Sequence, residues 1–168
     1  MKNNELFKLE NHTKSYINEK KTLNMAKNTI ITYSNVLESF IEYYRSFYEE
    51  ISIEEINRAF IVNYLDSKCF STSSKNLHAV ILKNFFIYLQ THVYVGIDFK
   101  SRLEHLTLKL SKKEPLALSS SEYEKVIDYF LKEENKRKRT FHSYRNLFIL
   151  KIILLCGVRV SECLGIKI

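Results

Sequence analysis

Glycine and proline are scarce in this chain, whose 168 residues include three glycines, one proline and no tryptophan. Sandwiches and barrels of β-strands need frequent turns rich in glycine and proline, so this scarcity argues against them. It favours long helices joined by few turns. We therefore expect an all-α fold.

Cysteine is also sparse. The three cysteines, Cys69, Cys156 and Cys163, are odd in number and form no Cys-x-x-Cys pair, and the five histidines show no ligand spacing. Neither a disulfide framework nor a metal site is predicted from these patterns. We expect buried thiols.

The chain lacks a long apolar run. The longest, Leu147 to Leu155, is interrupted by Lys151 and is far shorter than the roughly 20 residues needed to cross a bilayer. The first thirty residues carry charges throughout and lack the apolar segment of a secretory signal. We expect a cytoplasmic protein without a membrane partner, in which 145–156 forms a buried helix that Gly157 ends.

Acidic residues are absent from two long stretches, 20–37 and 67–97, which flank a segment that holds seven of them. The net charge of +7 favours a polyanionic partner, either nucleic acid or an acidic membrane face. The two stretches show where such a partner could approach.

Each acid-free stretch predicts an amphipathic helix. The first follows Asn24, a plausible cap, and the second starts at Ser71; both repeat apolar residues three and four positions apart. The apolar faces are Ile30, Tyr33, Leu37, Phe40, Ile41 and Tyr44, then Leu77, Ile81, Phe85, Tyr88 and Leu89. The residues expected to face outward are Asn28, Thr32 and Asn35, then Lys75, Asn76, Ala79 and Lys83.

Two capping boxes mark further helix starts, Ser52 with Glu55 and Ser119 with Glu122. Gly96 is expected to end the second amphipathic helix, and a lysine-rich segment with the single proline suggests a linker. The predicted organisation is an amino-terminal extension at 1–19, a helical domain at 20–98, a linker at 99–118 and the start of a second domain at 119–168.

The stretch "CGVRVSECLGIKI" places an arginine directly after a helix-ending glycine. Its residues Gly157, Val158, Arg159, Val160, Ser161, Glu162 and Leu164 resemble the opening of the catalytic domain of tyrosine recombinases, the phage-integrase and Xer-type enzymes. Thr29 and Tyr33 are similar to the Thr-x-x-x-Tyr pattern that begins the family's helical, SAM-like core-binding domain. The likeness covers about residues 20–168.

The resemblance implies site-specific DNA recombination or integration through a 3′-phosphotyrosyl intermediate, with Arg159 holding the scissile phosphate. A guanidinium presents a planar fork of donors to two phosphate oxygens and never loses its charge. Glu162 could orient it, or could serve only as a helix-start charge, and Ser161 is expected to cap the next short helix. No metal or nucleotide is implied, because the covalent link retains the energy of each phosphodiester.

The implied partners are double-stranded DNA and other recombinase protomers in a synaptic complex. A helix in the major groove can direct Asn and Lys toward bases and phosphates. The residues expected to face DNA are Lys27, Asn28 and Thr32 on the first helix and Lys75, Asn76 and Lys83 on the second.

The family also uses a β-hairpin lysine, a His-x-x-Arg cluster, a further His or Trp and a tyrosine nucleophile, all beyond the first arginine. The nine residues after Arg159 contain none of these, and the eleven tyrosines, which all precede it, lie mostly on apolar helix faces where a core role is expected. We expect this chain alone to be inactive. A non-enzymatic DNA-binding remnant and a helical protein-interaction module remain alternatives, and Arg159 would then be a solvated loop residue.

Overall fold

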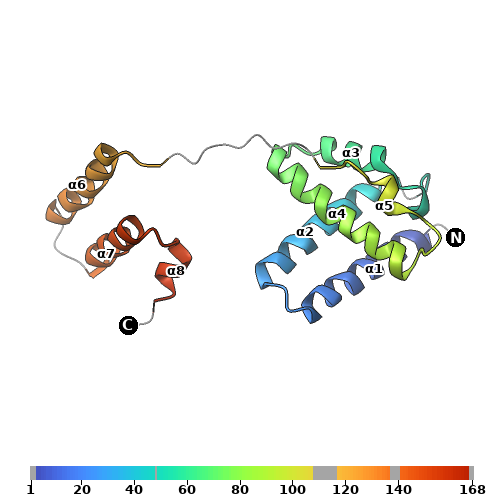
Figure 1. Cartoon of the computed structure of the whole chain (residues 1–168), viewed down its shortest axis with the longest axis horizontal. Coiled ribbons are helices and arrows are strands. Elements are labelled where there is room, and N and C mark those ends of the chain that lie inside the picture. The colour runs from blue at the N-terminus through green and yellow to red at the C-terminus, as the bar shows by residue number, and fades with distance from the viewer. Residues whose placement is uncertain (1–2, 48, 108–116, 137–140, 167–168) are drawn as a thin grey trace. The chain divides into compact units, whose positions relative to one another are not determined.

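The computed structural model describes residues 3–47, 49–107, 117–136 and 141–166. All regular secondary structure in these residues is helical, which confirms the all-α expectation (Figure 1). The chain divides into two compact units, Met1–Lys112 and Lys113–Ile168. Most of the expected linker, 108–116, lies outside the described residues.

Unit 1 (Met1–Lys112) is a bundle in which α1 contacts both α2 and α4. The expected boundary after residue 19 lies inside α1, whose Leu9 and Tyr16 are buried in the common core. Its elements are α1 (Asn3–Thr22), α2 (Lys27–Tyr44), the short 3-10 turn η1 (Ile53–Glu55), α3 (Arg58–Ser67), α4 (Thr72–His92) and α5 (Phe99–Arg102).

The helix starts in unit 1 follow their capping residues. The Glu55 carboxylate accepts a hydrogen bond from the backbone N–H of Ser52 at 2.9 Å, so the predicted capping box is present, but it opens η1 rather than a long helix. Asn57 then caps α3, and Ser71 caps α4 by accepting from the N–H of Ser74 at 3.2 Å. These side chains satisfy backbone donors that the helices leave without partners.

Two expected helix boundaries are wrong, the start of α2 and the end of α4. Asn24 does not cap α2: it lies in a turn with a φ of 55°, and Ala26 occupies the N-cap position. Asn tolerates this left-handed conformation better than most residues do, which explains its place in the turn. Gly96 does not end α4, which stops at His92 with Val93 as its C-cap.

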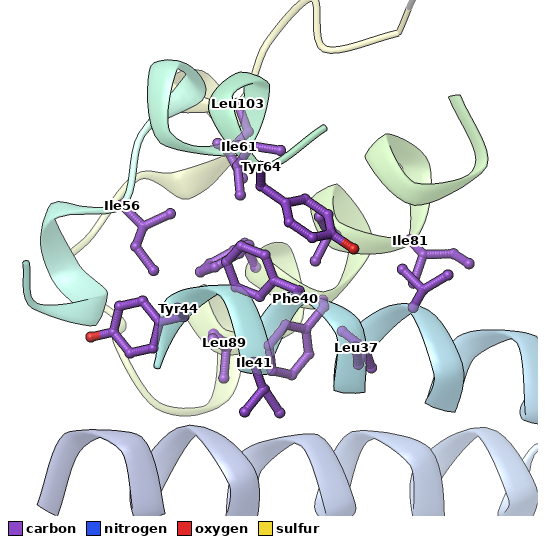
Figure 2. Packing of buried hydrophobic residues seen from close by; sticks show 14 of the residues in the cluster. Leu37, Phe40, Ile41, Tyr44, Ile56, Ile61, Tyr64, Ile81, Leu89 and Leu103 are labelled. Atoms are coloured by element: carbon purple, nitrogen blue, oxygen red, sulfur yellow. The ribbon is translucent and has the colours of Figure 1, made fainter. Parts of the chain in front are cut away.

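The core of unit 1 is built around aromatic rings. Phe40 is fully buried and makes an edge-on contact with Tyr64 at 5.3 Å between ring centroids (Figure 2). A second edge-on contact joins Phe40 to Phe86 at 5.8 Å. Edge-on pairs of this kind add stability beyond the burial of area. Tyr44 is also buried, and its hydroxyl donates to the carbonyl of Ile51 at 2.8 Å. The aromatic face predicted for 30–44 is therefore a core face.

Unit 2 (Lys113–Ile168) contains α6 (Ser120–Lys136), α7 (Phe141–Cys156) and α8 (Val160–Leu164), and α7 contacts the other two. The capping box before α6 is present, since Glu122 accepts from the backbone N–H of Ser119 at 2.8 Å. The prediction that 145–156 is a buried helix is wrong for much of its surface: Leu147 is buried, but Phe148 is 56% exposed. Both α6 and α8 contact this apolar helix.

The expectation of buried thiols holds only for Cys163. Cys69 lies exposed in the turn after α3, and Cys156 is exposed at the end of α7. All three are free thiols. Across the described ranges, no helix is long and apolar enough to span a membrane.

Candidate arginine turn and candidate nucleic-acid interface

The turn that carries Arg159 is fixed by Gly157. This glycine has a φ of +64°, and its N–H donates to the carbonyl of Ile153 at 3.0 Å, closing the end of α7. A left-handed residue after the last helical position is a common helix terminator that glycine adopts without steric cost. The predicted end of the helix at Gly157 is confirmed. Only Val158 separates it from Arg159.

Arg159 is the N-cap residue of α8 and is bound twice by Glu162. One carboxylate oxygen accepts from the backbone N–H of Arg159 at 2.8 Å, and the other accepts from its guanidinium Nη1 at 3.2 Å. Ser161, which was expected to cap this helix, lies inside it, because the Glu162 carboxylate already occupies the N-cap donor. Glu162 therefore both starts α8 and contacts the guanidinium.

The guanidinium is open to solvent, since the Arg159 side chain is 83% exposed. An exposed ion pair contributes little to folding stability. The pair limits the directions in which the arginine side chain can point. Among the described residues, Nε and Nη2 of the guanidinium have no hydrogen-bond partner. The arrangement leaves donors available to an anion.

The predicted residues of α2 lie at its amino-terminal end. Lys27 and Asn28 are exposed in its first turn, and the Thr32 hydroxyl donates to the carbonyl of Asn28 at 2.9 Å. The structure therefore brings these three side chains to one end of one helix, on the side away from core residues such as Leu37. Ile31, which had not been singled out, is exposed between them.

The predicted outward face of α4 is partly wrong, because the helix is rotated relative to the expected pattern. Ala79 was expected outside but is buried, while Leu77 was expected in the core but is exposed. Phe86 and Leu82 face the core instead. Phe86 stacks near Phe99 at 5.1 Å as well as near Phe40, and these tertiary contacts set the rotation.

Lys75 does not lie free on the outer face. Its ammonium pairs with Asp66 at 2.6 Å, which links the start of α4 to α3. Asn76 and Lys83 are half-exposed, and Asn84 is exposed one turn after Val80. The outer face of α4, defined here as Asn76, Leu77, Val80, Lys83 and Asn84, carries no acidic residue.

Tyr16, Tyr44 and Tyr64 are buried in the core of unit 1, as expected for most tyrosines. Burial raises the pKa of the Tyr64 hydroxyl, which is hydrogen-bonded to Nδ1 of His78 at 2.9 Å. Burial lowers the pKa of His78. Tyr16 is fully buried, and its pKa is raised first by burial and then by Tyr33 and Glu19. Hydroxyls held in this way are poor nucleophiles.

A metal site is not formed by the part of the chain that the structure describes, where no three His, Cys, Asp or Glu side chains are grouped to hold an ion. The fold and the site thus define an all-α chain of two units, with polar outer faces on α2 and α4 of one unit and an arginine on a glycine-fixed turn of the other.

Curated tyrosine recombinases are similar in sequence to this chain. The tyrosine recombinase XerH of Campylobacter jejuni is 30% identical over 158 residues, which cover 88% of this chain and 43% of the relative. The tyrosine recombinase XerC of Rickettsia bellii is 29% identical over 154 residues, which cover 85% of this chain and 48% of the relative. No family model and no solved structure matches. These named tyrosine recombinases match the chain over most of its own length, which supports the family, and the chain spans less than half the length of these relatives.

Proposed function

We propose that this chain supplies the DNA-binding helices and the first catalytic arginine of a tyrosine recombinase that acts in site-specific DNA recombination. The observation that carries the proposal is Arg159, held on a glycine-fixed turn and contacted by Glu162, in a chain related to named tyrosine recombinases over most of its length. The guanidinium fork fits two oxygens of a phosphodiester. In this role Arg159 holds the scissile phosphate and Glu162 positions it.

DNA contact is assigned to the amino-terminal end of α2 and the outer face of α4. Lysine ammonium groups bind phosphates, whereas asparagine amides and the Thr32 hydroxyl can reach phosphates or base edges. Lys75 contributes less than the others, because it must first leave Asp66. The residues of this proposed interface are Lys27, Asn28, Thr32, Lys75, Asn76 and Lys83.

The test is binding of the chain to fluorescently labelled duplex DNA, followed by anisotropy over a range of salt concentrations. Each phosphate contact makes the slope of log affinity against log salt concentration more negative by about 0.9, so two to three lysine contacts give a slope of about −2 to −3. An affinity that does not depend on salt would refute DNA binding. It would instead favour a helical protein-interaction module.

Arg159 is tested in the same assay. Arg159→Lys keeps the charge and the salt slope but lowers the affinity, because lysine lacks the bidentate fork. Arg159→Ala lowers the slope as well, by about 0.9. Equal affinities for wild type and both variants would remove Arg159 from the interface.

The tyrosines that precede Arg159 are not expected to cut DNA, since Tyr16, Tyr44 and Tyr64 are buried in the core. Incubation with a nicked duplex followed by denaturing electrophoresis detects any covalent protein–DNA adduct. An adduct that survives denaturation would show that one of the tyrosines before Arg159 is a nucleophile. We further propose that the partners in the full reaction are other recombinase protomers assembled on the same DNA.

A further inference from the structure

One exposed β-branched residue lies on the solvent side of α2 and another on the outer face of α4. Ile31 is 47% exposed and Val80 is 41% exposed, although both lie in helices whose other large apolar residues form much of the core. Neither belongs to the core cluster. Their side chains therefore contribute little to the packing of unit 1.

The surroundings of Val80 are polar on both sides along the helix. Residues three and four positions away lie next to each other on a helix surface. For Val80 these neighbours are Asn76, Leu77, Lys83 and Asn84, the other members of the outer face of α4. Val80 and the exposed Leu77 thus form an apolar centre that two amides and one ammonium border.

The surroundings of Ile31 repeat this arrangement. Its neighbours three and four positions away are Lys27, Asn28, Ser34 and Asn35, again with two amides and one ammonium and again without an acidic residue. A single exposed apolar side chain is ordinary on a protein surface. An exposed β-branched residue bordered by two asparagines and one lysine on each of two helices that contact each other is a more specific pattern, although Val80 also has the apolar Leu77 beside it where Ile31 has Ser34.

This pattern is complementary to A·T pairs in the major groove. A thymine presents its 5-methyl group there, which makes apolar contacts, and an adenine presents N6 and N7, which an asparagine amide can bind together. The ammonium groups of Lys27 and Lys83 can reach the flanking phosphates. Guanine and cytosine offer no methyl group to an isoleucine or a valine.

We infer that Ile31 and Val80 contact thymine 5-methyl groups, so that the outer faces of α2 and α4 select DNA with A·T pairs at the positions they cover. This inference rests on the proposed DNA-binding function and adds the class of base pair that each helix recognises.

The experiment replaces thymine by uracil, which removes the methyl group and leaves base pairing intact. The chain is titrated with three labelled duplexes of equal length: alternating A·T, the same duplex with uracil, and alternating G·C. We expect the A·T duplex to bind most tightly and the uracil duplex to bind about fourfold more weakly for each contacted methyl group. The G·C duplex should bind more weakly still.

Variants assign the effect to each helix. Val80→Ala and Ile31→Ala should each reduce the ratio of thymine to uracil affinity by about fourfold. Val95→Ala is the matched control, because it removes the same atoms from an exposed valine beyond α4 and should keep the full ratio. Circular dichroism checks that every variant retains its helices.

Equal binding of the thymine and uracil duplexes by the wild type would overturn the inference, as would a ratio that Val80→Ala and Ile31→Ala both leave unchanged. In either case salt-dependent binding to all three duplexes would leave the proposed function standing. Absence of salt-dependent binding to any duplex would refute the proposed function, and this inference with it.

Discussion

The lysines of unit 1 are expected to differ in their effect on DNA binding in a way that follows from one ion pair. Lys83→Ala and Lys27→Ala should each reduce the steepness of log affinity against log salt concentration, the salt slope, by about 0.9. When salt rises from about 50 to 200 mM, the loss of affinity of each variant should therefore be about 3.5-fold smaller than that of the wild type. Lys75→Ala should change the slope less, because the Lys75 ammonium is held 2.6 Å from Asp66 and has to break that pair to reach a phosphate. Anisotropy titrations at four or more salt concentrations give the slopes.

A double-mutant cycle tests this reasoning directly. In an Asp66→Asn background Lys75 is released, so Lys75→Ala should then lower the slope by the full amount of about 0.9. Lys14→Ala, which removes an exposed lysine from α1, serves as the control and should leave the slope unchanged. If Lys14→Ala lowers the slope as much as Lys83→Ala, or if Lys75→Ala has the same effect in both backgrounds, the assignment of charges to the interface is wrong.

Three further outcomes concern stability. Phe40→Ala should lower the free energy of unfolding of unit 1 by about 3–5 kcal/mol, because its ring is fully buried. Phe148→Ala should lower that of unit 2 by only about 0.5 kcal/mol, because its residue is 56% exposed. Hydrogen exchange resolved by peptide measures both losses, and equal losses would contradict the described core. Gly157→Ala forces a φ of +64° on a residue with a side chain and should cost about 1–2 kcal/mol, with Gly157→Asn costing less, both seen as lost amide protection at the end of α7. Burial lowers the pKa of His78 below its ordinary 6.5, so the folded state disfavours the charged ring and the stability of unit 1 should fall as pH drops through 6.5 toward the lowered pKa. Urea unfolding should show a flatter pH dependence for His78→Gln than for wild type, and parallel curves would rule out His78 as the cause.

Several local signals in the sequence predicted the structure, although Asn24, Gly96 and Ser161 did not mark the helix boundaries expected of them. Ser71 as a cap, Ser119 with Glu122 as a capping box and Gly157 as a helix end depend only on residues within four positions of one another, and all three are present. Arg159 was singled out by the resemblance of residues 157–164 to the opening of the recombinase catalytic domain, and the structure places it at the start of α8, just after Gly157.

Features set by tertiary contacts were harder to predict. The rotation of α4 depends on which ring Phe86 contacts. It also depends on Ala79, which is buried although a residue as small as alanine can face either the core or the solvent. The ion pair of Lys75 joins residues nine positions apart on two helices. Neither is visible in the spacing of apolar residues along one helix.

The helix α1 was missed as part of the core because of a buried polar residue. Thr13 occupies a core position between Leu9 and Tyr16, and its hydroxyl donates to the carbonyl of Leu9 at 3.0 Å. That local bond satisfies the hydroxyl without another partner, so threonine can fill an apolar site. In the sequence, it interrupts the apolar pattern.

The separation of inner and outer faces on α4 has a consequence for how such a protein can diverge. Leu82, Phe85 and Phe86 hold the helix in the core, while Val80 and Asn84 take no part in that cluster. Substitutions at the outer positions therefore carry little folding penalty, and single nucleotide changes can alter them without compensating changes elsewhere. New target preferences can arise gradually on this surface while the core beneath it stays the same.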